Sequence, residues 1–204
     1  MKKPIIIVLL LSLIAANPSI SAQDHSTTSD NYLERHPIYD YQDQMLNSTD
    51  TIPGFLENQN KVKITGTIYQ SDGTTPAKDV ILYIEQAEEH GDFDLREDNE
   101  KRYVHNRGWV KTDANGHYTF YTYVPGNDRR YNQLQQLFPA IKEPSKAEYD
   151  IASFLFEEDP LLTKRCRKRM AKKGDPTRIL DLNEIDGLMV AQKDIILPSA
   201  PESL

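Results

Sequence analysis

Tyr103 and His105 are two potential metal ligands separated by a single residue. In an extended segment, positions i and i+2 point the same way, so this pair could begin a ferric or zinc site. A closed metal site needs three or four protein ligands, and the sequence has no His-x-His, Cys-x-x-Cys or His-Glu-x-x-His spacing to supply them. The pattern alone therefore favours a packed aromatic residue and its neighbour over a pair of ligands.

A strongly basic segment, residues 161–173, is the second candidate for chemistry. Asp159 suits the N-cap, Pro160 the first helical position and Gly174 the position just past the end, so we expect a helix. Its apolar residues recur every four positions and predict one buried stripe: Leu162, Cys166 and Met170. The cations then point into water, which favours a solvated face over a docking site for an anionic surface. On this stripe Cys166 is expected to be a small buried hydrophobe and not a nucleophile.

Residues 1–22 have the architecture of a secretory signal peptide. Two lysines precede an apolar run from Ile5 to Ala16, and small residues follow up to Ala22. We therefore expect the mature chain to be exported, either periplasmic or secreted. The apolar run is too short for a comfortable transmembrane helix and nothing comparable follows it, so no membrane insertion is expected.

Charge and cysteine content limit the classes of partner. The chain has 24 basic and 31 acidic residues and a formal net charge of −7. This balance disfavours a nucleic-acid partner, because nucleic-acid binders normally carry a basic footprint that offsets phosphate repulsion. Cys166 is the single cysteine, so no disulfide within the chain is possible and stability must come from the core.

The rest of the chain divides into an arm and a β-rich domain. Residues 23–59 are rich in Asp, Asn, Ser, Thr and Gln, which favours a solvated leader over an arm that lies across the domain. From Lys61 onward, apolar and polar residues alternate as in a strand with one buried face. Further strands are expected at residues 80–85, 110–112, 118–124, 151–156, 178–182 and 188–197. Together they predict a mainly β sandwich over 60–197 with one short helix, followed by a C-terminal tail, 198–204.

The turn at residues 113–116 reads Asp-Ala-Asn-Gly and separates two of the expected strands. An Asn-Gly pair between β-rich runs is typical of a hairpin, because both residues tolerate positive φ. We therefore expect the strands on its two sides to form a hairpin. Three histidines are expected at the surface, two in the arm and one beside this turn: His25, His36 and His117.

Several motifs follow one another in a characteristic order. They are Lys63-Ile-Thr-Gly-Thr-Ile-Tyr, residues 80–87, Arg102-Tyr-Val-His, residues 108–120, Val124-Pro-Gly, residues 141–144, residues 156–162 and Lys193-Asp-Ile-Ile-Leu. This order resembles the catalytic domain of the intradiol ring-cleavage dioxygenases, which include protocatechuate 3,4-dioxygenase, and the resemblance covers about residues 50 to 197. It implies a β-sandwich with a mononuclear non-haem Fe(III), held by two tyrosines and two histidines, that activates a catecholate for attack by oxygen.

The resemblance also assigns the metal positions, and most hold other residue types. Tyr103 falls on the first tyrosine ligand. Counting back from Ile141 without gaps gives the remaining three positions: Asp128 for the second tyrosine, and Gln136 and Phe138 for the two histidines. Tyr131 could serve as the second tyrosine if the loop slides, but no histidine lies between His117 and the C-terminus.

These replacements favour a non-catalytic, exported β-sandwich that uses its cleft or loops for binding. Ferric iron prefers anionic oxygen, and Tyr103 with Asp128 or Tyr131 supplies two such donors; the Gln136 amide is a weak ligand and Phe138 has no donor. The first alternative is an Fe(III)-dependent dioxygenase that cleaves a small aromatic diol with this atypical ligand set. The second is a transthyretin-like adhesion or carbohydrate-binding module, because the fold alone does not choose among uses.

Overall fold

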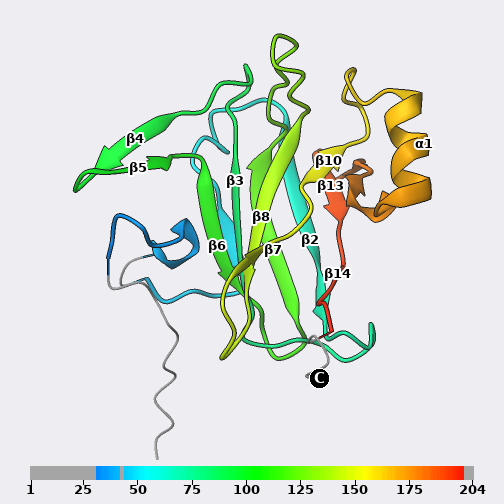
Figure 1. The fold of residues 1–204 in the computed structure, drawn as a ribbon. Coiled ribbons are helices and arrows are strands. Elements are labelled where there is room, and N and C mark those ends of the chain that lie inside the picture. The colour runs from blue at the N-terminus through cyan, green and yellow to red at the C-terminus, as the bar shows by residue number, and fades with distance from the viewer. Residues whose placement is uncertain (1–30, 42–43, 200–204) are drawn as a thin grey trace, which may run out of the picture.

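The computed structural model describes residues 31–41 and 44–199. The expected signal peptide, His25 and residues 200–204 of the expected tail lie outside this range. The described residues form two mixed β-sheets that enclose one hydrophobic core, with a two-stranded ribbon at one side and a helix at the other (Figure 1). The expected mainly β sandwich with one short α-helix is confirmed.

The first sheet has β2 at its centre. Its order is β1 (Thr49–Thr51), β7 (His117–Tyr123), β2 (Lys61–Tyr69), β13 (Leu188–Gln192) and β12 (Asn183–Ile185), and β14 (Ile195–Ile196) also pairs with β2. The alternation predicted from Lys61 onward is present, because Val62, Ile64 and Ile68 of β2 are buried in the core.

The second sheet has β3 and β8 at its centre. Its order is β11 (Ile179–Leu180), β10 (Phe154–Phe156), β8 (Gln136–Lys142), β3 (Ile81–Gln86) and β6 (Arg107–Lys111), and β9 (Tyr149–Asp150) pairs with β8. Leu82 and Ile84 face the core from β3, opposite the apolar side chains of β2. The ribbon consists of β4 (Leu95–Asp98) and β5 (Lys101–Val104), and it extends away from the sandwich in Figure 1.

The prediction of a hairpin at residues 113–116 is wrong. β6 pairs with β3 in the second sheet and β7 pairs with β2 in the first, so the turn connects the two sheets. Its geometry needs one left-handed residue: Gly116 has φ +72°, and a Cβ there would lie 2.5 Å from the Ile68 oxygen. The Asp113 carboxylate accepts hydrogen bonds from the backbone N–H groups of Asn115 and His117, at 2.8 and 3.0 Å, and holds the turn.

The helix α1 (Lys164–Lys173) starts later than expected. Thr163 is its N-cap, whereas the Asp159 carboxylate accepts hydrogen bonds from the Leu161 and Gln135 N–H groups, at 2.9 and 2.8 Å. Gly174 ends the helix, as expected.

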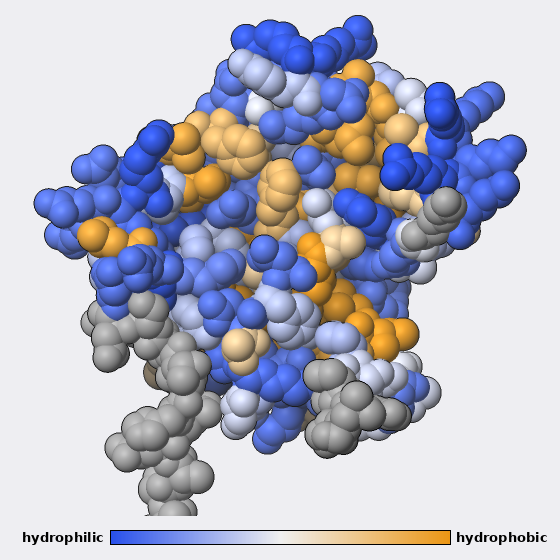
Figure 2. All heavy atoms as spheres, in the orientation of Figure 1, coloured by the Kyte–Doolittle hydropathy of each residue, from blue (hydrophilic) through white to orange (hydrophobic). Residues whose placement is uncertain are grey.

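The predicted buried stripe of this helix is also wrong. Leu162 is buried just before the helix, but Cys166 is exposed and Met170 only partly buried. The reason is that α1 stands at the side of the sandwich and contacts the 3-10 turn η2 (Pro176–Arg178), so it has no broad apolar surface to cover. Hydrophilic atoms dominate this side of the molecule in Figure 2.

The described part of residues 23–59 is not a solvated leader. It lies across the domain, which was the alternative expectation. Ile38, in the 3-10 turn η1 (Pro37–Tyr39), is fully buried against Tyr83 and Ala140 on the outer face of the second sheet. Farther along, β1 pairs in parallel with β7, and Ile52 enters the core. His36, expected at the surface, is half-buried and its ring meets Tyr83 edge-on.

Candidate functional site

Tyr103 lies in β5, on the ribbon that contacts the arm. The Arg107 guanidinium carbon lies 4.1 Å from the centre of its ring, so a fixed cation covers this side chain. The recess that Tyr103 lines is not lined by His105. His105 follows the end of the strand, and its pKa is lowered, first by burial and then by Arg96. The donor pair of Tyr103 and His105, which the pattern did not favour, therefore does not share this recess.

Asp128 and Tyr131, the two candidates for the second tyrosine position, lie in a turn closed by an Asp128–Gln133 bridge. Both carboxylate oxygens of Asp128 accept hydrogen bonds from the Arg130 side chain, which lowers the Asp128 pKa. Tyr131 is 79% exposed, and Arg130 lies 5.7 Å from its ring centre. The negative charge of Asp128 is thus already compensated by Arg130, and Tyr131 faces solvent.

Gln136 and Phe138 lie on the outer face of β8, because the alternating residue Leu137 points into the core. The Phe138 ring packs 5.9 Å from Phe93. Within residues 31–41 and 44–199, no hydrogen bond, ion pair or ring contact joins Tyr103 to Asp128, Tyr131 or Gln136. These side chains do not fit ferric iron, since one donor is committed to a guanidinium and Phe138 offers none.

An ionic cluster that the sequence did not predict lies beside Tyr103. Asp40 of the arm has a side chain only 5% exposed, and three cations surround its carboxylate. The nearest nitrogens of these cations lie 3.0 Å away for Arg35, 2.7 Å for Lys101 and 3.6 Å for Arg107. A single buried carboxylate is therefore shared by three positive side chains, two of which belong to the domain and one to the arm.

Aromatic rings complete this cluster. The Arg107 guanidinium lies between Tyr103 and Trp109, 4.1 and 5.0 Å from the ring centres, and the Lys101 ammonium lies 4.9 Å from that of Tyr32. A recess with a volume of about 310 Å³ opens beside them. The residues that line it come from the arm, the ribbon and β6: Tyr32, Arg35, Asp40, Glu97, Asp98, Tyr103 and Arg107.

A second hollow, of about 420 Å³, lies on the other side of the arm and includes Phe138 among its lining residues. Within it the Tyr83 hydroxyl donates to a Glu85 carboxylate oxygen at 2.5 Å. Burial raises the pKa of Tyr83, and the neighbouring Glu85 raises it further. Tyr83 is therefore a neutral donor and not a ready anionic ligand.

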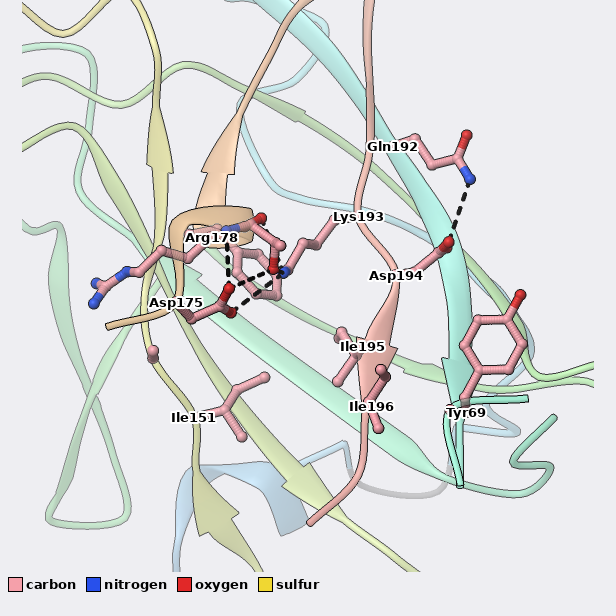
Figure 3. Close-up of a pocket in the computed structure, with 13 residues that line it drawn as sticks. Tyr69, Ile151, Asp175, Arg178, Gln192, Lys193, Asp194, Ile195 and Ile196 are labelled. Carbon is pink, nitrogen blue, oxygen red and sulfur yellow. Dashed lines mark hydrogen bonds and ion pairs between the residues drawn. The ribbon is translucent and has the colours of Figure 1, made fainter. Parts of the chain in front are cut away.

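A third cavity, of about 740 Å³, is lined by residues 192–196, which include β14, and by residues of η2 (Figure 3). Lys193 occupies an inward-facing position there, in line with Ala191, Ile195 and Leu197, which are all buried. Its ammonium donates to the Thr177 carbonyl and hydroxyl oxygens at 3.0 and 2.8 Å. The inward side of the strand therefore carries a cation in a run of apolar residues.

Lys193 is desolvated, and the acidic groups near it compensate its charge only in part. Desolvation lowers the Lys193 pKa, and Asp175, whose carboxylate lies 3.8 Å away, opposes that shift. In Figure 3 the Arg178 guanidinium points away from Lys193, and Asp194 lies on the other side of the strand. Asp194 accepts a hydrogen bond from the Thr67 N–H at 2.9 Å, in place of a regular backbone pairing. This cavity thus holds one buried amine without a close carboxylate.

No protein-family model matches the chain, and no curated protein sequence matches it. Solved structures do match. The dioxygenase domain of a dioxygenase and carbohydrate-binding protein fusion from Streptomyces sp. SirexAA-E aligns at a TM-score of 0.56 and 17% identity, over 78% of this chain and 92% of that one. An intradiol ring-cleavage dioxygenase from Tetranychus urticae aligns at 0.51 and 15%, over 76% and 87%.

This chain has the intradiol dioxygenase fold. Wild-type catechol 1,2-dioxygenase from Acinetobacter radioresistens aligns at a TM-score of 0.54 and 12% identity, over 79% of this chain and 60% of that enzyme. At these identities the likeness concerns the fold alone.

Only some of the buried polar residues of this fold could have been predicted from the sequence. Lys193 interrupts an apolar alternation, so its inward position could have been found from the sequence. Asp40, Lys101 and Arg107 come from separate segments with no shared spacing. They meet only because the arm crosses the second sheet.

Proposed function

We propose that this chain is an exported, non-catalytic member of the intradiol ring-cleavage dioxygenase family that uses the outer face of its second sheet for binding. The observation that carries the proposal is the Arg107 guanidinium lying on the ring of Tyr103. Tyr103 is the one position that retains the ligand type of the family. A cation that already covers this ring opposes the approach of a second, more highly charged cation.

The other three positions support the loss of iron chemistry. Ferric iron needs anionic oxygen or imidazole donors, and loss of even one supporting partner of a ligand typically lowers metal affinity by about 10 to 100-fold. Here Asp128 is bonded to Arg130, Gln136 offers only an amide, and Phe138 packs against Phe93. In the described ranges, no group of three or more His, Cys, Asp and Glu side chains is arranged to hold a metal.

Export rests on residues 1–22, whose basic start, apolar run and small-residue exit favour cleavage after Ala22. Among the helices of the described residues, none is long and apolar enough to cross a membrane. Mass spectrometry of the protein recovered from outside the cytoplasm of a secreting host tests this point. We expect a mass that lacks residues 1–22; the full-length mass in the cytosolic fraction would contradict export.

Iron loading tests the loss of catalysis. The purified chain is incubated with ferric iron, desalted, and assayed for bound metal, visible absorbance and oxygen uptake with catechol and protocatechuate. We expect no tightly held iron, no tyrosinate-to-iron colour and no uptake, and the Tyr103→Phe variant should behave identically. One ferric ion per chain together with opening of an aromatic diol would overturn the proposal and favour the dioxygenase with the atypical ligand set.

A further inference from the structure

We propose that the recess beside Arg107 is a binding site for a small carboxylate, and that the arm occupies it with the side chain of Asp40. A free carboxylate and Asp40 then compete for the same two domain cations, Lys101 and Arg107. This inference deepens the proposed function and rests on it only in requiring that no metal sits at Tyr103.

In the described part of the chain, the domain itself carries two buried cations at the recess without a buried carboxylate of its own to pair with them. The Lys101 and Arg107 side chains are 7% and 13% exposed, and both point to the place that Asp40 fills. Lysine and arginine are rarely this buried unless they are paired. Their carboxylate partner is supplied by the arm, from a position more than sixty residues away in the sequence.

The nearby acids of the domain do not take over this role. Glu85 is directly opposite Arg107 in the β3–β6 pair, but one of its carboxylate oxygens accepts the Tyr83 hydroxyl. Glu97 and Asp98 line the mouth of the recess from β4, where both are exposed to solvent. Water screens these rim charges, so the buried cations depend on a carboxylate placed inside the recess.

Asp40 leaves one buried donor of Arg107 unpaired. The Nη1 atom of Arg107 is buried and has no hydrogen-bond partner among the residues that the structure describes, whereas Asp40 Oδ2 lies 2.7 Å from the Lys101 ammonium. Arg107 Nη1 and Asp40 Oδ2 lie 3.6 Å apart, whereas hydrogen bonds between charged nitrogen and carboxylate oxygen are usually about 2.7–2.9 Å long. Arg107 therefore keeps an unused buried donor beside the Asp40 carboxylate.

The recess also has room for a small ligand. The recess has a volume of about 310 Å³ and is walled by the rings of Tyr32 and Tyr103. A ligand that is not tethered to the arm can approach Arg107 more closely than Asp40 does. The chemistry that the site selects is defined by its present occupant, which is a carboxylate on a short aliphatic stem.

A fluorescence titration tests the inference, because the chain has a single tryptophan and Arg107 lies 5.0 Å from the ring centre of Trp109. Acetate is titrated into wild type and Asp40→Ala at constant ionic strength with chloride, in iron-free buffer containing a chelator. Acetamide, which has a similar shape and no charge, is the ligand control. We expect saturable acetate binding that is at least tenfold tighter in Asp40→Ala, because the internal competitor is gone, and no response to acetamide.

Two further variants make the outcome decisive. Adding Arg107→Met to Asp40→Ala should abolish acetate binding, whereas adding Lys193→Met, which removes a buried cation elsewhere, should leave it unchanged. Equal affinities in wild type and Asp40→Ala, or no binding in either, would overturn the inference. If Asp40→Ala folds only partly, Asp40→Asn replaces it in the same titration; failure of acetate to bind Asp40→Asn more tightly than wild type is equally contrary.

The outcome is independent of the iron assay. Acetate binding in the chelated protein can fail while the chain still lacks iron and catalysis, which would remove the carboxylate site and leave the proposed function. Conversely, iron binding with ring cleavage would overturn the proposed function, whatever acetate does.

Discussion

Two lysines are buried to the same extent in this sandwich and are stabilised in different ways. The Lys101 and Lys193 side chains are each 7% exposed. Lys101 has the Asp40 carboxylate at 2.7 Å, and that carboxylate is itself buried. Lys193 has two neutral oxygens of Thr177 at 3.0 and 2.8 Å, while the nearest carboxylate, Asp175, is 3.8 Å away and 53% exposed.

The difference shows where the molecule depends on charge pairing. At Lys101 several buried charges rely on one carboxylate from the arm, so loss of that carboxylate leaves cations without compensation. At Lys193 the ammonium is solvated by Thr177 and opens onto a cavity, so no single charge is indispensable. The stability of the face that the arm covers thus depends on one buried carboxylate. Substitutions beside Lys193 should cost less stability.

Asp40→Ala should have the largest effect on stability. Breaking a buried ion pair by removing one partner typically costs about 3–5 kcal/mol, and here the change leaves Lys101, Arg107 and Arg35 facing one another. Urea unfolding at neutral pH measures the loss. The matched control is Asp175→Asn beside Lys193, which removes the charge but keeps a side-chain oxygen for the hydrogen bonds that Asp175 accepts from Thr177. It should change the unfolding free energy by less than about 1 kcal/mol because exposed pairs contribute little. Equal losses in the two variants would contradict the comparison.

A pair of double-mutant cycles sharpens the same contrast. Asp40→Ala combined with Lys101→Met should give a coupling free energy of about 1–3 kcal/mol, as expected for charged residues in contact. The cycle of Asp175→Ala with Lys193→Met should give less than about 0.5 kcal/mol. A larger coupling at Lys193 than at Lys101 would mean that Asp175 and not Thr177 stabilises the second lysine.

These two regions also differ in how far the sequence predicts them. The sandwich follows from alternation in β2 and β3, and the inward position of Lys193 follows from the same alternation near the C-terminus. The Asp40 cluster has no such periodicity, because a polar arm gains its order from tertiary contacts of Ile38 and Ile52. Local rules could not reveal those contacts.

The errors in the predicted elements have the same origin. Asn115-Gly116 indicated a hairpin, yet pairing of β6 with β3 and of β7 with β2 decided the topology. The resemblance placed Tyr103 at a ligand position, but the Arg107 guanidinium over its ring is a three-dimensional fact that motif order does not contain. Sequence therefore predicted which strands exist better than which side chains meet.

Thr177→Val tests the neutral oxygens that hold Lys193. The hydroxyl accepts a hydrogen bond from the ammonium at 2.8 Å, and loss of one such bond to a charged donor should cost about 1–2 kcal/mol. Thr177→Ser keeps the hydroxyl and should remain close to wild type in the same urea unfolding experiment. If Thr177→Ser loses as much as Thr177→Val, the effect comes from the Thr177 methyl group and not from the hydrogen bond.

Lys193→Met should have the smallest effect at neutral pH, below about 1 kcal/mol, because an apolar side chain of similar length replaces a buried cation that has no close carboxylate. Desolvation lowers the Lys193 pKa in the folded chain below its ordinary value of 10.5, so between these two pKa values the unfolded chain binds more protons than the folded one. Stability contributed at this site therefore rises with pH through that window. The unfolding free energy of wild type minus that of Lys193→Met should increase as the pH rises toward 10.5, while the same difference for Lys101→Met serves as the comparison. A flat or falling difference for Lys193→Met would show that Asp175 compensates the charge of the buried ammonium. The two lysines would then differ in geometry alone.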